Sequence, residues 1–122
     1  MTPTALTVIG IDPGIHTGWA ICRDGKIIES GVQIFDLGRG ESAGMRFLRF
    51  RRWLGELHAQ VRGPVAVWAY ERAHHRGGPA TEIGVGLCTR IQEYAAEAKS
   101  ESLPVHSATL KKWATGSGRA DK

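Results

Sequence analysis

Near the start of the chain lies Leu6-Thr7-Val8-Ile9-Gly10-Ile11-Asp12-Pro13-Gly14, a short run of mostly β-branched and apolar residues that is stopped by a Pro-Gly pair. This pattern predicts a β-strand that ends in a turn. A carboxylate at the end of an apolar strand is costly to bury unless a cation or hydrogen bonds compensate its charge. Asp12 is therefore the first candidate for a functional residue.

Two more strands are expected directly after this turn. Residues 18–22 and 26–35 are rich in apolar residues and flank Asp24-Gly25. An Asp-Gly pair between two such runs is a strong hairpin signal. The first three strands should therefore form an antiparallel meander.

The spacing of apolar residues changes after Ala43 and predicts an amphipathic helix that ends at Gly63-Pro64. Arg46, Arg49 and Arg52 are expected on its other faces. Residues 80–99 predict a second helix. The apolar residues expected in the first helix are Phe47, Phe50, Leu54, Leu57 and Val61.

The nearly continuous apolar run from Val65 to Glu71 predicts a fourth strand, covered on both faces. Residues 103–107 predict a fifth strand, and residues 109–115 predict the start of a third helix. This order favours an α/β fold with one mixed five-stranded sheet flanked by helices, in which three antiparallel strands are followed by two parallel ones. A right-handed crossover would place the fourth strand parallel to the first and beside it.

Glu71 repeats the pattern of Asp12, because it too closes an apolar strand. Side-chain alternation puts Glu71 on the face of Ala69, and puts Asp12 on the face of Gly10. If the two strands are neighbours, their acids stand about 5 Å apart across the ladder, close enough to share divalent cations. The alternative interpretation is that each acid caps a turn or pairs with an arginine.

The composition favours one domain over residues 1–122, because 122 residues with 42% hydrophobic content bury one modest core. There are 16 Lys and Arg against 12 Asp and Glu, and this net charge of +4 favours polyanionic partners. No apolar run is long enough for a membrane helix, and no basic segment leads into a signal core, so a cytoplasmic protein is expected. Cys22 and Cys88 are interpreted as buried thiols rather than zinc ligands.

Three separated motifs in the same order resemble those of RuvC-type Holliday junction resolvases, which have an RNase H-like fold. They are the opening run to Gly14 followed by residues 17–20, the strand that ends at Glu71, and a stretch in which Lys111 precedes a Gly-x-Gly turn that runs into Ala-Asp-Lys. The resemblance covers most of the chain. It implies a metal-dependent endonuclease that resolves four-way DNA junctions.

The resemblance also implies the roles of individual residues. Asp12 and Glu71 match the catalytic carboxylates that bind Mg2+, with Mn2+ as the alternative metal. Lys111 and Lys122 match lysines that hold DNA phosphates, and Arg119 lies in the same stretch. Asp121 is interpreted as structural.

The sequence departs from the family in two places. The family continues past Ala-Asp-Lys into a helix that bears further carboxylates, and the given sequence ends at Lys122, so we expect a nuclease domain without its C-terminal acidic helix. The loop 72–79 lacks the aromatic residue that usually stacks at the junction centre. His74, His75 and Arg76 are candidate DNA contacts there, with plain solvent exposure as the alternative.

The second helix carries Gly84 and Gly86, which thin one of its sides so that another helix can approach. Related resolvases pair through helices, and symmetric cutting of a four-way junction requires two sites related by a two-fold axis, so a homodimer is expected. The four tryptophans, Trp19, Trp53, Trp68 and Trp113, are expected to pack in the core or in an interface.

Three other functions stay open at the level of the sequence. An actin-like ATPase or sugar kinase has a similar phosphate loop after a strand, but it needs two lobes and therefore a longer chain. A YqgF-like nuclease shares the fold and processes RNA. A module that binds branched DNA without cutting it would also fit these residues.

Overall fold

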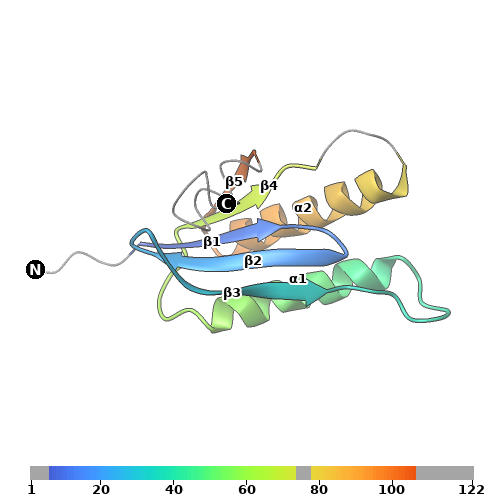
Figure 1. Cartoon of the computed structure of the whole chain (residues 1–122), viewed down its shortest axis with the longest axis horizontal. Helices are drawn as coiled ribbons and strands as arrows, with labels where there is room; N and C mark the ends of the chain where they lie inside the picture. The colour runs from blue at the N-terminus through green and yellow to red at the C-terminus, as the bar shows by residue number, and fades with distance from the viewer. Residues whose placement is uncertain (1–5, 74–77, 107–122) are drawn as a thin grey trace, which may run out of the picture.

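The computed structural model describes residues 6–73 and 78–106, which form five strands and two helices. Figure 1 shows the arrangement of these elements. In chain order they are β1 (Thr7–Asp12), β2 (His16–Arg23), β3 (Lys26–Ile34), α1 (Gly44–Ala59), β4 (Val67–Glu71), α2 (Pro79–Glu97) and β5 (Glu101–Val105). The predicted third helix, residues 109–115, lies outside the described residues.

The strands form one mixed sheet in the order β3-β2-β1-β4-β5. β1 pairs antiparallel with β2, and β2 pairs antiparallel with β3. β4 pairs parallel with β1 on its other side, and β5 pairs parallel with β4. The predicted meander, the two parallel strands and the position of β4 beside β1 are therefore confirmed.

The turn between β2 and β3 is the predicted Asp-Gly hairpin turn. Asp24 has a φ of 52° and Gly25 a φ of 80°. Positive φ at both central residues matches the twist of a hairpin, and Asp and Gly tolerate it best. Asp24 also binds the start of β1, since its Oδ1 accepts the Leu6 N–H at 3.0 Å and its own N–H donates to the Leu6 carbonyl at 3.0 Å.

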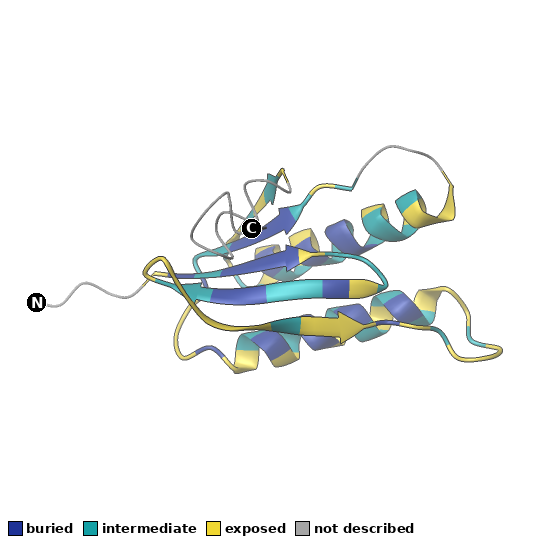
Figure 2. Ribbon diagram, in the orientation of Figure 1, coloured by how far each residue is buried: buried dark blue, intermediate teal, exposed yellow. Residues whose placement is uncertain are grey.

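Both described helices cover the same face of the sheet (Figure 1). On that face, alternate residues of β1 and β4 enter the core together with the inner sides of the helices, which Figure 2 colours as buried. β3 is an edge strand and is largely exposed. The largest fully buried side chains are Trp68, Phe50, Ile9, Ile11, Ile21, Leu54, Leu57, Leu87, Ile91 and Thr17.

The helices meet along a seam in which Gly86 of α2 accommodates the Phe47 ring of α1. A Cβ added at Gly86 would lie 2.3 Å from Cε1 of that ring. Gly84 lies close to Ala73 in a similar way, because a Cβ added at Gly84 would lie 3.2 Å from the Ala73 Cβ. The predicted close approach at these glycines is therefore made within the chain, by α1 and by residue 73.

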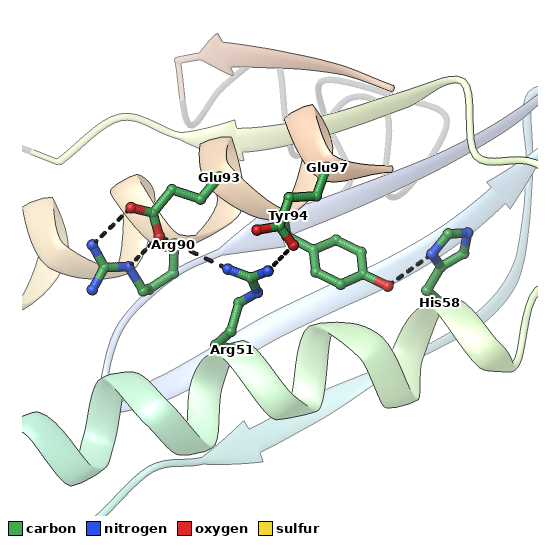
Figure 3. A network of polar contacts seen from close by, with 6 residues as sticks. All are labelled: Arg51, His58, Arg90, Glu93, Tyr94 and Glu97. Carbon is green, nitrogen blue, oxygen red and sulfur yellow. Dashed lines mark hydrogen bonds and ion pairs between the residues drawn. The ribbon is translucent and has the colours of Figure 1, made fainter. Parts of the chain in front are cut away.

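Polar contacts join the same two helices, as Figure 3 shows. Arg51 of α1 forms ion pairs with Glu97 and with Glu93 of α2. His58 Nδ1 lies 2.9 Å from the Tyr94 hydroxyl, and the Arg51 guanidinium lies over the Tyr94 ring at 5.4 Å. Because these contacts are partly exposed, each adds little to stability.

The prediction that Arg46 lies on an outer face of α1 is wrong. It is only 9% exposed, and its Nε donates to the Phe35 carbonyl at 2.8 Å. The guanidinium thus satisfies a backbone acceptor just past the end of β3. A buried arginine is stable here because it is paired with an acceptor.

Several element boundaries differ from the predicted ones. β2 begins at His16 rather than Gly18, because its ladder with β3 extends to His16↔Ile34. β5 spans Glu101–Val105 rather than residues 103–107, because the Glu101 N–H already donates to the Ala66 carbonyl. Pro104 fits there because β5 is an edge strand of the described sheet.

Among the described residues, no helix has the length and apolar character needed to cross a membrane.

Candidate active site

The two predicted acids end neighbouring parallel strands. The last paired residues in the ladder between β1 and β4 are Ile11 and Tyr70. The next residue of β1 is Asp12 and the next residue of β4 is Glu71, and each is the final residue of its strand. Neighbouring strands lie about 5 Å apart, so the backbones of the two acids are adjacent where these two inner strands end.

The two acids belong to the face of the sheet that α1 and α2 leave uncovered. Asp12 is opposite Gly18 of β2, and a Cβ added at Gly18 would lie 3.9 Å from the Asp12 Cβ. Gly10 pairs with Ala69, and alternation puts these small residues on the same face as Asp12 and Glu71. Asp12 is exposed and Glu71 is half-buried. Gly10 and Ala69 are buried and Gly18 is half-buried, so small residues surround the acids on this face.

Glu71 is held by elements on both of its sides. β5 pairs Val105 with Glu71, and the Arg72 N–H donates to the Val105 carbonyl at 3.3 Å. From α2, the Cys88 thiol reaches the Glu71 carbonyl oxygen at 3.6 Å. Burial raises the pKa of the Cys88 thiol, so it stays protonated and able to donate. The strand end that carries Glu71 is therefore fixed from α2 and from β5.

No family model and no curated protein sequence matches the chain. Solved structures do match it. Thermus thermophilus RuvC in complex with a Holliday junction substrate aligns with a TM-score of 0.69 and 21% identity, over 88% of this chain and 68% of that one. A second structure of Thermus thermophilus RuvC aligns with a TM-score of 0.68 and 22% identity, over 94% of this chain and 72% of that one. The chain has the RuvC-like fold.

Within this RuvC-like fold, the available ligand set suits a hard cation better than zinc. In the described part of the chain, no group of three or more His, Cys, Asp and Glu side chains is arranged to hold a metal ion. Mg2+ is typically bound through one or two carboxylates, with water and substrate phosphates as its other ligands. The pair Asp12 and Glu71 fits that requirement. The described cysteines do not add to it, since Cys22 and Cys88 are free thiols whose pKa values are raised by burial.

The predicted DNA contacts lie outside the described residues. These are His74, His75 and Arg76 in one segment and Lys111, Arg119 and Lys122 in the other.

Eight arginines lie between Arg39 and Arg76, both included, and several of the described ones are used within the fold. Arg46 is buried against the Phe35 carbonyl, Arg49 pairs with Glu41, and Arg51 pairs with acids of α2. Charge density along this part of the chain therefore does not by itself mark a DNA surface.

One residue on the face of the acids was missed by the sequence analysis. His16 begins β2, is exposed, and shares a face with Gly18 by alternation. Gly18 in turn lies opposite Asp12. The sequence could have placed His16 on this face, because His16 is two residues before Gly18 and alternate residues of a strand share a face. It was overlooked because β2 was predicted to begin at Gly18.

Proposed function

We propose that this chain is a metal-dependent endonuclease that cuts branched DNA, with the four-way junction as its substrate and phosphodiester hydrolysis as its reaction. The observation that carries the proposal is the adjacency of Asp12 and Glu71 at the ends of β1 and β4. The RuvC-like fold and the junction bound to one structural neighbour support the choice of substrate.

In this proposal Asp12 and Glu71 hold Mg2+, or Mn2+ in its place. When bound, such ions activate a water molecule and stabilise the leaving oxygen of a phosphodiester. The protein contributes the two carboxylates at a fixed spacing set by the sheet. It also contributes the small residues Gly10, Gly18 and Ala69, which lie on the same face of the sheet as the two acids.

The DNA is proposed to be held by basic residues in two segments that follow Glu71 in the sequence. Lys111, Arg119 and Lys122 would contact phosphates, and His74, His75 and Arg76 would contact the junction. Two matched cuts in a four-way junction require two sites related by a two-fold axis, so a homodimer is proposed as the active form. The protein is proposed to act in the cytoplasm.

The test is cleavage of synthetic four-way, forked and duplex DNA, and of the corresponding RNA, across a range of Mg2+ and Mn2+ concentrations. Wild-type protein is expected to cut the four-way junction best. Asp12→Asn and Glu71→Gln are each expected to lower the cleavage rate more than about 100-fold, because losing a ligand costs more than losing an outer-shell partner, which costs about 10–100-fold. Junction binding, measured by gel shift without metal, should persist in both variants.

Glu56→Gln is the matched control, because Glu56 is an exposed acid of α1, on the opposite side of the sheet. It should cut at the wild-type rate. Undiminished cleavage by Asp12→Asn would refute the metal assignment. Junction binding by wild type without cleavage in either metal would instead favour the non-cleaving module, and cleavage of RNA alone would favour a YqgF-like activity.

A further inference from the structure

Thr17 is a fully buried polar residue of β2, with none of its surface exposed. A buried hydroxyl is stable only when it is hydrogen-bonded. The Thr17 hydroxyl donates to the Gly14 carbonyl at 2.7 Å and accepts the Gly14 N–H at 3.2 Å. One side chain thus binds both backbone polar groups of Gly14.

Gly14 lies in the short loop that connects β1 to β2 directly after Asp12. Thr17 closes this loop from β2. The neighbouring Ile15 carbonyl accepts the Phe35 N–H at 2.7 Å, which ties the same loop to the residue after β3. The backbone that leaves Asp12 is therefore fixed at two consecutive residues.

The Thr17 side chain and the Asp12 side chain belong to opposite faces of the sheet. Gly18 faces Asp12, since a Cβ at Gly18 would lie 3.9 Å from the Asp12 Cβ. Successive residues of a strand point to opposite faces, so Thr17 points toward the side covered by the helices. Its hydroxyl is consequently out of reach of a metal ion or a DNA strand beside Asp12.

We propose that Thr17 is a positioning residue, whose hydroxyl holds the loop at Gly14 and thereby sets the orientation of the Asp12 carboxylate toward a divalent cation. This inference rests on the proposed function. Ligands bind metal tightly only when the groups around them restrict their geometry. Without the hydroxyl, Gly14 loses two hydrogen bonds, and the backbone that follows Asp12 is held less rigidly.

The experiment compares Thr17→Val, which keeps the shape and removes the hydroxyl, with Thr17→Ser, which keeps the hydroxyl. Mn2+ affinity is measured from the paramagnetic broadening of the amide signals next to Asp12 and Glu71. Hydrogen exchange at the Gly14 amide is followed in parallel. Thr17→Val is expected to weaken Mn2+ binding about tenfold, the lower end of the range for outer-shell partners. It should also speed exchange at Gly14, and Thr17→Ser should restore both values.

Thr89→Val is the matched control, because the Thr89 hydroxyl also donates to a backbone carbonyl, that of Val85 at 3.0 Å, within α2 and away from the acids. It should leave Mn2+ affinity unchanged. If Thr17→Val does not fold, Thr17→Cys replaces it, and its weaker hydrogen bonding should give an intermediate loss of affinity.

The results separate this inference from the function on which it rests. Faster exchange at Gly14 with unchanged Mn2+ affinity would overturn the positioning role and leave Thr17 a structural residue. Absence of Mn2+ broadening near Asp12 and Glu71 in wild-type protein would instead overturn the metal site itself.

Discussion

The Glu41 carboxylate ties the loop between β3 and α1 to the helix. It accepts the Gly38 N–H at 2.6 Å and binds the Arg49 guanidinium through both of its oxygens. The hydrogen bond from Arg49, followed by that from Gly38, lowers the pKa of Glu41 from 4.5 to about 2. The charged form is therefore favoured by the folded state.

This carboxylate predicts a pH dependence of stability. Because the pKa of Glu41 is lower in the folded state, its contribution is complete above its ordinary pKa of 4.5 and is lost as the pH falls through about 2. Glu41→Gln should therefore lower the melting temperature at neutral pH, by a small amount because the pair is partly exposed, and the difference from wild type should vanish near pH 2. Thermal unfolding followed by circular dichroism measures this difference.

Arg49→Gln supplies the control for Glu41. If the ion pair between Arg49 and Glu41 causes the loss of stability, the variant with both Glu41→Gln and Arg49→Gln should be no less stable than Glu41→Gln alone. A melting-temperature difference between Glu41→Gln and wild type that persists unchanged at pH 2 would contradict the assignment.

At the scale of elements, the contact between Gly86 and Phe47 fixes how α2 packs on α1. A Cβ at Gly86 would lie 2.3 Å from the Phe47 ring, whereas a Cβ at Gly55 of α1 would lie 3.9 Å from Tyr94, an ordinary contact. Gly86→Ala is therefore expected to destabilise the fold by about 1–3 kcal/mol. Gly55→Ala, an alanine in an uncrowded helix position, should stabilise it by up to about 1 kcal/mol. Chemical denaturation measures both.

A double variant identifies the cause of the Gly86 effect. On a Phe47→Ala background the ring is gone, so Gly86→Ala should no longer destabilise. An unchanged penalty on that background would show that Phe47 is not what the glycine accommodates.

The elements that the sequence predicted well are those with local signals. The Asp-Gly turn and the two flanking strands follow from residues close together in the chain, and the structure has them. The burial of Arg46 could not be predicted in this way, because its partner is the Phe35 carbonyl of another element. The predicted start of β5 was wrong for a related reason, because the extent of that strand is set by its ladder with β4.

At the scale of the molecule, the adjacency of Asp12 and Glu71 was predictable because the handedness of crossovers limits where β4 can lie. What the sequence did not predict is that both described helices cover the face opposite the acids (Figure 1). That arrangement depends on how the whole core packs. No local pattern in α1 or α2 encodes which side of the sheet they share.

The proposed metal site predicts a gain in stability that does not depend on catalysis. Binding to the folded state alone stabilises it by RT ln(1 + [M]/Kd), about 1.4 kcal/mol when the metal concentration is ten times Kd. Mg2+ or Mn2+ should therefore raise the melting temperature of wild-type protein by several degrees, and should not raise that of Asp12→Asn. Sodium chloride at matched ionic strength is the control for general screening. An equal rise in Asp12→Asn would contradict the site.

The two acids come from strands that are far apart in the chain and meet only when β4 joins β1. During synthesis Asp12 leaves the ribosome before Glu71, so the two carboxylates cannot lie side by side until the chain has been made through β4. The proposed nuclease activity would thus depend on the pairing of β4 with β1.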